Sequence, residues 1–350
     1  MRLRLVVSVL VLLVCGLGAG LAQAAPVGCT RSVPSRLAYG WPLKPFDQPH
    51  PVRGNFGDPR TLYWGLLSDV DQGGSFTFHN GIDVSAPAGT PVFPVVDGVV
   101  VHVAYDWVSV RSPGRHFQYW HIRPRVALGQ RVLARKTVLG RIVLGAEHVH
   151  LTEIDGTAPV NPLEPGHLTP YRKTTWPVVR SIDVRGTGLH GLQGWVWFVA
   201  DVSDYPALDP PPPWGDLPVT PALVSWKLRA ADGKVVVPLR VAADFRTHLP
   251  RERAFWRVYA SRTRQNQPVI ALTHWHTPGR YLFDLTPGGF DTRRLHDGRF
   301  RLTVIVSDVC GNTTARTESI VIANEGGPAS GFRALVSAWK PLRRLGVSGG

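Results

Sequence analysis

Hydrophobic residues along this chain recur with the two-residue period of β-strands, and no stretch shows a convincing helical period. The clearest alternation runs from 300 to 307, where the apolar positions are Phe300, Leu302, Val304 and Val306. Such a strand has one face directed to a core and one to solvent. Many similar short runs are separated by Gly and Pro, which predicts an all-β protein.

The first part of the pattern, residues 41–172, predicts an antiparallel sheet domain behind a polar lead-in at residues 25–40. An apolar run spans 92–103. Residues 107–111 and 116–122 flank Ser112-Pro113-Gly114-Arg115, a turn signal, and therefore predict a hairpin. Residues 130–143 carry further short strands around Gly129 and Gly140.

From residue 173 onward the pattern predicts a second domain, a β-sandwich over residues 173–325. A linker-like stretch, PYRKTTWP, precedes apolar runs at 194–202, 222–229, 234–241, 269–273, 280–285, 300–309 and 319–323. The segment DGRFRLTVIVSDVCGN resembles the closing hairpin of bacterial immunoglobulin-like modules. DPPPPWG at 209–215 is interpreted as a stiff surface loop, and residues 326–350 as a flexible basic tail.

The N-terminus has the features of a secretory signal. Arg2 and Arg4 precede an apolar run from Leu5 to Leu21, and the small-x-small sequence Ala22-Gln23-Ala24 follows. Residues 1–24 are therefore predicted to be a signal peptide cleaved after Ala24. The alternative is an uncleaved anchor, which the glycines of a short run disfavour. No other run is long enough to span a bilayer, so we expect a secreted or envelope protein.

Composition and net charge limit the classes of partner that the protein is expected to bind. The 350 residues, 44% of them hydrophobic, suffice for two globular domains. The formal net charge of +14 falls to +12 once Arg2 and Arg4 are removed. A basic protein favours anionic partners. Outside the cytosol, acidic wall polymers fit this charge, and nucleic acid is excluded as an expected partner.

Two cysteines, Cys29 and Cys310, remain after the leader is removed. An even pair in an oxidising compartment predicts a disulfide. Two separate buried thiols are the alternative.

Two short segments carry residues suited to a metal. In His79-Asn80-Gly81-Ile82-Asp83, an extended chain directs His79 and Asp83 to one side, with Gly81 leaving space between them. In His148-Val149-His150, the two histidines share a strand face. Imidazole nitrogen and carboxylate oxygen bind zinc, and a catalytic site uses three such ligands. Alone, each segment is equally typical of surface or core histidines.

Taken in order, these segments resemble a known family. HNGID, then YWHI with His121, then LGQRVLARKTVLGRI, then HVHLTE are similar to the lysostaphin-like zinc peptidases, known as the M23 or LytM family. RGNFGDPR upstream resembles the family's Gly-Phe-Gly and Arg segment. The resemblance covers roughly residues 41–155.

The resemblance implies a zinc site formed by His79, Asp83 and His150. It makes His121 and His148 the two catalytic histidines that do not bind the metal. One would take the proton of the attacking water and the other would stabilise the oxyanion, in an order that the sequence leaves open. The implied function is cleavage of peptide bonds in the peptidoglycan stem or cross-bridge.

The chain also departs from the family pattern. The acid that often follows the His-x-His pair by two positions is displaced, because Thr152 stands there and Glu153 comes next. This change puts the support of His150 in question.

Two other functions remain open at this point. One is a non-catalytic envelope protein that binds or regulates, although such relatives usually lose site residues. The other makes the sandwich a wall-targeting module with the peptidase domain ancillary. His274-Trp275-His276 repeats the His-x-His spacing without an Asp partner and is interpreted as structural.

Overall fold

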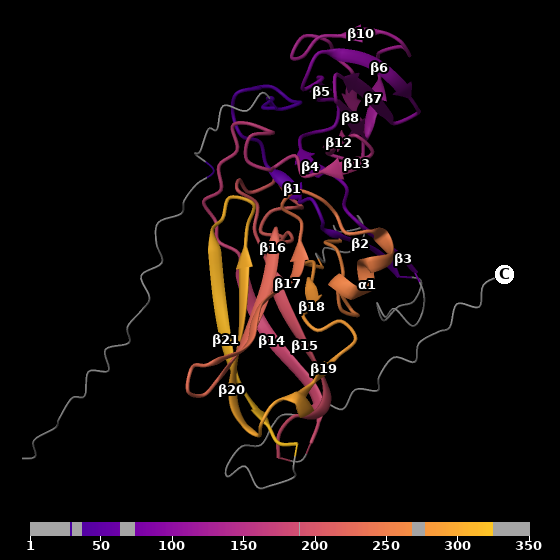
Figure 1. The fold of residues 1–350 in the computed structure, drawn as a ribbon. Coiled ribbons are helices and arrows are strands. Elements are labelled where there is room, and N and C mark those ends of the chain that lie inside the picture. The colour runs from indigo at the N-terminus through magenta and orange to yellow at the C-terminus, as the bar shows by residue number, and fades with distance from the viewer. Residues whose placement is uncertain (1–28, 30–36, 64–73, 189, 268–276, 325–350) are drawn as a thin grey trace, which may run out of the picture.

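The computed structural model describes residues 29, 37–63, 74–188, 190–267 and 277–324, and these are nearly all β (Figure 1). In this part of the chain the α-helical element is α1 (Phe255–Val258). The prediction of an all-β fold is confirmed. The signal peptide, the basic tail, the 269–273 run and His274-Trp275-His276 lie outside the described residues.

One antiparallel sheet carries the candidate residues. Its strand order is β1-β4-β12-β8-β7-β6-β10, with β13 paired to β12. The predicted hairpin is present as β7 and β8, and Gly114 supplies the left-handed residue of its turn at φ 78°. The strands are β1 (Val52–Gly54), β4 (Ile82–Ser85), β6 (Gly98–Val103), β7 (Trp107–Ser112), β8 (Arg115–Trp120), β10 (Arg131–Val132), β12 (His148–Asp155) and β13 (Ala158–Val160).

A three-stranded sheet stands beside it, formed by β5 (Pro91–Val92), β11 (Gly140–Ile142) and β9 (Ile122–Pro124). The apolar run at 92–103 is therefore two strands in different sheets, not one. Pro94 lies in the gap, and proline cannot donate to a strand ladder.

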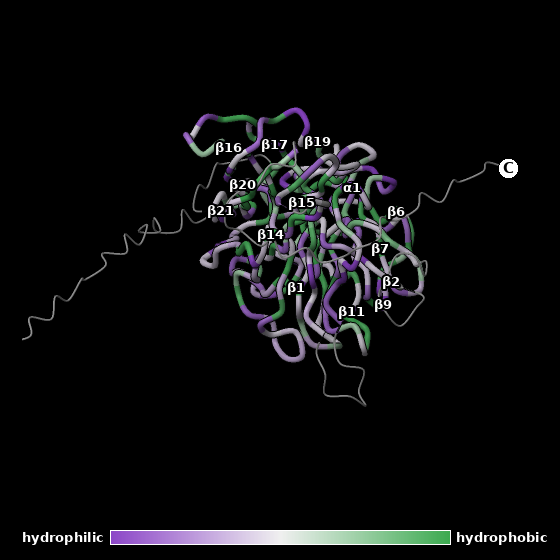
Figure 2. Tube along the Cα trace, turned by 90° about the horizontal axis from the view of Figure 1, so that it is seen from below, coloured by the Kyte–Doolittle hydropathy of each residue, from purple (hydrophilic) through white to green (hydrophobic). Residues whose placement is uncertain are grey.

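Two further sheets enclose a second core and form a β-sandwich. Trp226 of one sheet meets Phe198 of the other edge to face, with ring centroids 5.7 Å apart. Figure 2 shows hydrophobic segments gathered where β15, β16 and β20 run together. The first sheet contains β14 (Val178–Thr187), β15 (Gln193–Ser203), β18 (Leu282–Asp284) and β19 (Phe290–Asp291). The second contains β17 (Val235–Asp244), β16 (Leu223–Ala230), β20 (Gly298–Ser307) and β21 (Thr313–Ile322).

A hairpin from the first half of the chain packs into this second core. It consists of β2 (Pro59–Tyr63) and β3 (Gly74–Phe78) and lies beside α1 in Figure 1. Phe78 is 5.3 Å from Phe255 between ring centroids, and Phe76 is 4.7 Å from Trp256. Phe56 is buried in the same cluster. The two cores are therefore interlocked and do not separate along the sequence at residue 172.

A disulfide links residue 29, before the first sheet, to a turn in the second half of the chain. It joins Cys29 to Cys310, with 4.9 Å between their Cα atoms. Cys310 lies in the turn between β20 and β21, where Asp308 Oδ1 accepts hydrogen bonds from the backbone of Cys310 and Asn312. Val309 and Cys310 pack against the first core. None of the helices in the described residues is long and apolar enough to cross a membrane.

Candidate metal centre

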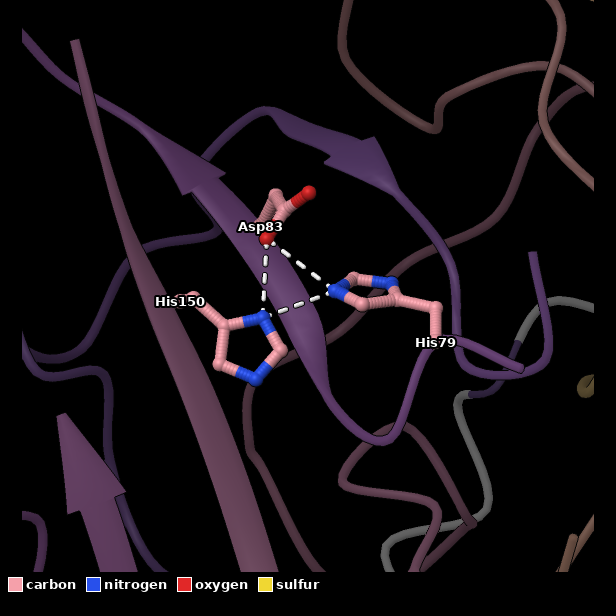
Figure 3. Close-up of side chains that lie close together, drawn as sticks. All are labelled: His79, Asp83 and His150. Carbon is pink, nitrogen blue, oxygen red and sulfur yellow. Dashed lines mark hydrogen bonds and ion pairs between the residues drawn. The ribbon is translucent and has the colours of Figure 1, made fainter. Parts of the chain in front are cut away.

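Three side chains converge at the edge between β3, β4 and β12 (Figure 3). His79 directly follows β3, and Asp83 and His150 are direct cross-strand partners on β4 and β12. His79 Nε2 lies 2.7 Å from His150 Nδ1, and each nitrogen lies 3.1 Å from Asp83 Oδ1. Within the described residues, this is the group of three such side chains placed to share one metal ion.

These three atoms fit zinc. A tetrahedral zinc ion with ligand bonds of about 2.0–2.1 Å separates its ligand atoms by roughly 3.3 Å. The observed separations of 2.7–3.1 Å need to widen by only a few tenths of an ångström. Two imidazoles and one carboxylate are also the ligand types of catalytic zinc sites, where a fourth position is left open.

Hydrogen bonds behind the triad fix which nitrogen of each ring faces the centre. His79 Nδ1 lies 2.8 Å from the Asn55 carbonyl oxygen, so Nδ1 carries the proton and Nε2 is left with its lone pair. His150 Nε2 lies 2.8 Å from Thr152 Oγ1, which leaves Nδ1 as the ligand atom. Thr152 thus takes the supporting position that the sequence left in question.

Glu153 does not reach the metal centre. It is buried on the opposite side of β12, where Tyr39 donates to its carboxylate at 2.5 Å and Arg115 forms an ion pair with it. His167 Nδ1 lies 2.9 Å away. Successive strand residues face opposite ways, so a shift of one position removes the acid from the site.

The protonation states also suit a metal. Burial lowers the pKa of His79 to about 3 and lowers the pKa of His150 below its usual value, so both rings are neutral near neutral pH. Burial works to raise the pKa of Asp83, but His79 and Arg60 outweigh it and hold that pKa well below the usual range. Arg60 Nη2 contacts Asp83 Oδ2 at 2.5 Å, which leaves Oδ1 facing the histidines.

The two remaining histidines lie next to the triad. His148 is on β12, and its Nε2 is 3.4 Å from Asp83 Oδ1. The His121 ring centroid is 4.5 Å from that of His148. Burial, aided by His148, lowers the pKa of His121 to about 4, so this ring is also neutral near neutral pH.

His121 does not lie on the second arm of the hairpin, as the sequence suggested. β8 ends at Trp120, and β9 begins at Ile122 in a different sheet. His121 makes the connection with φ at 65°, a left-handed conformation uncommon for residues other than glycine. The change of sheet turns its ring toward His148.

The centre opens into a cavity of about 670 Å³ that both halves of the chain line. Sequence analysis gave no site role to several of its lining residues, among them Arg53, Arg60 and Trp214. Arg53 and Arg60 lie in RGNFGDPR, which drew attention only as a family likeness. Trp214 lies in DPPPPWG, interpreted as a surface loop. The second half further contributes the segment 248–252. No local pattern indicates that this segment faces the metal centre, because the contact depends on the packing of the two halves.

Gly81→Ala is expected to disrupt the triad. A Cβ at position 81 would lie 2.9 Å from His150 Nε2 and closer still to the Leu151 carbonyl oxygen. Ala should therefore displace the His150 ring and weaken zinc binding by on the order of 10–100-fold, the range for disturbed ligand support. Competition with a chromogenic chelator measures this. Gly89→Ala, at a glycine whose Cβ would meet nothing within 4 Å but whose φ is 82°, controls for general backbone strain. Equal zinc affinity in the two variants would contradict the expectation.

Comparison with known proteins gives matches among solved structures only. No family model matches the chain, and no curated protein does. Among solved structures, it is similar to the catalytic domain of the prophage-encoded M23 protein EnpA from Enterococcus faecalis, with 24% identity, 35% of this chain and 95% of that chain covered, and a TM-score of 0.26. A zinc containing peptidase from Vibrio cholerae matches at 23% identity over 36% of this chain and 40% of its own, with a TM-score of 0.28. Lysostaphin matches at 17% identity over 41% and 86%, with a TM-score of 0.24. These TM-scores are low, and we transfer neither fold nor activity from these proteins to this chain.

Proposed function

We propose that the chain is a secreted zinc-dependent endopeptidase that hydrolyses peptide bonds in peptidoglycan. The observation that carries this proposal is the convergence of His79, Asp83 and His150 on one point, with two further histidines beside them that are not needed as ligands. A purely structural zinc site is closed by a fourth protein ligand, whereas this one opens into a cavity.

The chain's own residues divide the chemistry. When bound, zinc would polarise a peptide carbonyl and acidify a water molecule. His79, Asp83 and His150 would hold the ion, and Arg60 orients Asp83. His121 and His148 lie on the cavity wall, within reach of a proton that must be moved and of an oxygen that gains negative charge.

The substrate class rests on the resemblance to lysostaphin-like peptidases. That resemblance implies peptides of the peptidoglycan stem or cross-bridge. The excess of basic residues suits attachment to anionic wall polymers. The sandwich is proposed to be an immunoglobulin-like module, on the sequence of its closing hairpin β20–β21. Export is supported by the signal-like residues 1–24 and by the Cys29–Cys310 disulfide, a bond typical of oxidising compartments.

Digestion of purified peptidoglycan by the protein lacking residues 1–24 tests the proposal. Mass analysis of the products is expected to show new amino and carboxyl termini within the peptide portion and intact glycan linkages. His150→Ala should release none of these products. A zinc-loaded, folded protein that leaves peptidoglycan and its peptides intact would refute the proposal and favour a non-catalytic envelope protein.

A further inference from the structure

Arg53 contacts His148 at Nδ1, the ring nitrogen opposite the one that faces Asp83. It lies on β1 and is only 9% exposed. Its Nη2 is 2.6 Å from His148 Nδ1 and donates to the Ala146 carbonyl oxygen at 2.8 Å. The two hydrogens of one guanidinium nitrogen thus serve both the histidine ring and the backbone that precedes it.

This contact determines where His148 carries its proton. A guanidinium only donates hydrogen bonds, so the nearby Nδ1 must accept. A ring that carries a single proton then has it on Nε2. That nitrogen lies 3.4 Å from Asp83 Oδ1, on the side of the metal centre. Without Arg53 the ring would have a different partner, since Nδ1 also lies 2.7 Å from the Ala146 carbonyl oxygen and could donate to it.

The second half of the chain holds Arg53 in place. Trp214, in the loop between β15 and β16, lies over the guanidinium with 3.9 Å from Arg53 Cζ to the ring centroid. The face of an indole ring attracts a cation, most strongly where water is excluded. Burial lowers the pKa of Arg53 to about 10, which leaves it charged at neutral pH.

Arg53 is short of other partners. No carboxylate of the described residues lies within ion-pair distance of it, and its buried Nη1 has no hydrogen-bond partner among them. A buried cation in such surroundings is costly. The charges of Asp83 and Glu147 compensate part of this cost from beyond ion-pair distance. The indole face is the direct contact that adds to them, so the position of Arg53 depends in part on Trp214.

We propose, on the basis of the proposed peptidase function, that Trp214 and Arg53 are a positioning pair that fixes His148 as a hydrogen-bond donor toward the substrate. His148 Nε2–H then stabilises the carbonyl oxygen of the peptide under attack, and His121 is left to accept the proton of the water. The sandwich, through Trp214, thereby takes part in setting up the catalytic histidines.

The tautomer of His148 tests the pair without any need for activity. In zinc-loaded protein labelled with ¹⁵N-histidine, the His148 ring is expected to show a protonated Nε2 and an unprotonated Nδ1. Arg53→Met removes the donor at similar length and should move the proton to Nδ1, facing Ala146 O. A protonated Nδ1 in the unmodified protein would overturn the proposal, even if the protein cleaves peptidoglycan.

Kinetics with folded, zinc-loaded variants test the role of the second half. Trp214→Ala is expected to lower kcat by on the order of 10–100-fold, as for other residues that orient a catalytic group, with little change in KM or zinc content. Trp214→Phe keeps an aromatic face and should recover most of that loss. Trp195→Ala is the matched control, since Trp195 is 50% exposed on the same sandwich and outside the cavity.

Two outcomes of these kinetics would overturn the proposal. One is a kcat for Trp214→Ala equal to that of Trp195→Ala. The other is a loss in Trp214→Ala that Trp214→Phe does not relieve. If the unmodified protein cleaves no peptide at all, the proposed function fails, and the tautomer measurement alone decides whether the positioning pair exists.

Discussion

His121→Ala is expected to keep its zinc and lose activity, whereas His150→Ala loses both. His150 supplies one of three atoms that converge on the metal position, whereas the His121 ring packs against the His148 ring and is not one of the three. Removing a general acid or base costs about 10²–10⁴-fold in rate. The kcat of His121→Ala on a soluble cross-bridge peptide should fall by that factor, and metal analysis should still find about one zinc per chain.

His116→Ala is a suitable control for His121→Ala. His116 lies on the same strand pair, β7–β8, and bonds to Arg111 at the surface away from the cavity. Its replacement should leave both zinc and kcat unchanged. The division of roles fails if His121→Ala is as poor in zinc as His150→Ala, because His121 would then be a ligand.

Replacing Cys29 with Ser should produce the largest loss of stability. The disulfide closes a loop with a sequence separation of 281 residues, which in the chain-entropy model stabilises the folded state by up to about 5 kcal/mol. Urea unfolding of Cys29→Ser is expected to show a lower free energy of unfolding by a large part of that amount. Titration of the unfolded, unreduced parent protein without residues 1–24, and so without Cys15, should find no free thiol.

The effect of losing the disulfide can be separated by experiment from the effect of replacing a cysteine side chain. Cys310→Ser and the double variant should be as unstable as Cys29→Ser, because one bond is lost in each case. Reductant should destabilise the parent protein to the same level and leave the variants unaffected. Two reactive thiols in the parent, or a reductant effect on the variants, would be incompatible with this explanation.

The local part of the site was readable from the sequence. His148 and His150 are two apart, a spacing that places them on one face of any strand, and the structure has them on β12. The prediction that His79 and Asp83 approach each other from an extended segment gave the right neighbourhood. Only Asp83 is in a strand, however, and His79 lies in the preceding turn.

Contacts between residues far apart in the sequence could not be predicted from the sequence. Arg53 meets Trp214, which lies 161 positions further along the chain, and nothing in either segment indicates the other. The same holds for the hairpin β2–β3, whose Phe76 and Phe78 look like ordinary strand residues yet belong to the second core. β14 was also missed, although Ile182 and Val184 alternate with Asp183 and Arg185 as in a half-exposed strand. Pairing with β15 stabilises it.

The interlocked cores bear on whether a fragment of residues 25–172 could act alone. The spacing of the five site residues suggests such a fragment as sufficient. In the folded chain, however, Phe56 and Phe78 are buried against residues from 179 onward. A fragment ending at 172 would expose both side chains, and exposed apolar surface of this kind favours aggregation. A protein that contains both halves of the chain, residues 25–350, is therefore the appropriate material for every experiment above.

The adjacency of Phe78 and His79 links metal binding to the folding of the second core. Phe78, a member of the second core, is followed immediately by His79, a member of the metal triad. An ion that binds only the folded state draws the whole folding equilibrium toward that state. Here a residue that would hold the ion and a residue of the sandwich core are joined by a single peptide bond. Unfolding of the sandwich core is expected to release the ion, so the metal concentration in the surroundings should change the stability of strands that never touch the metal.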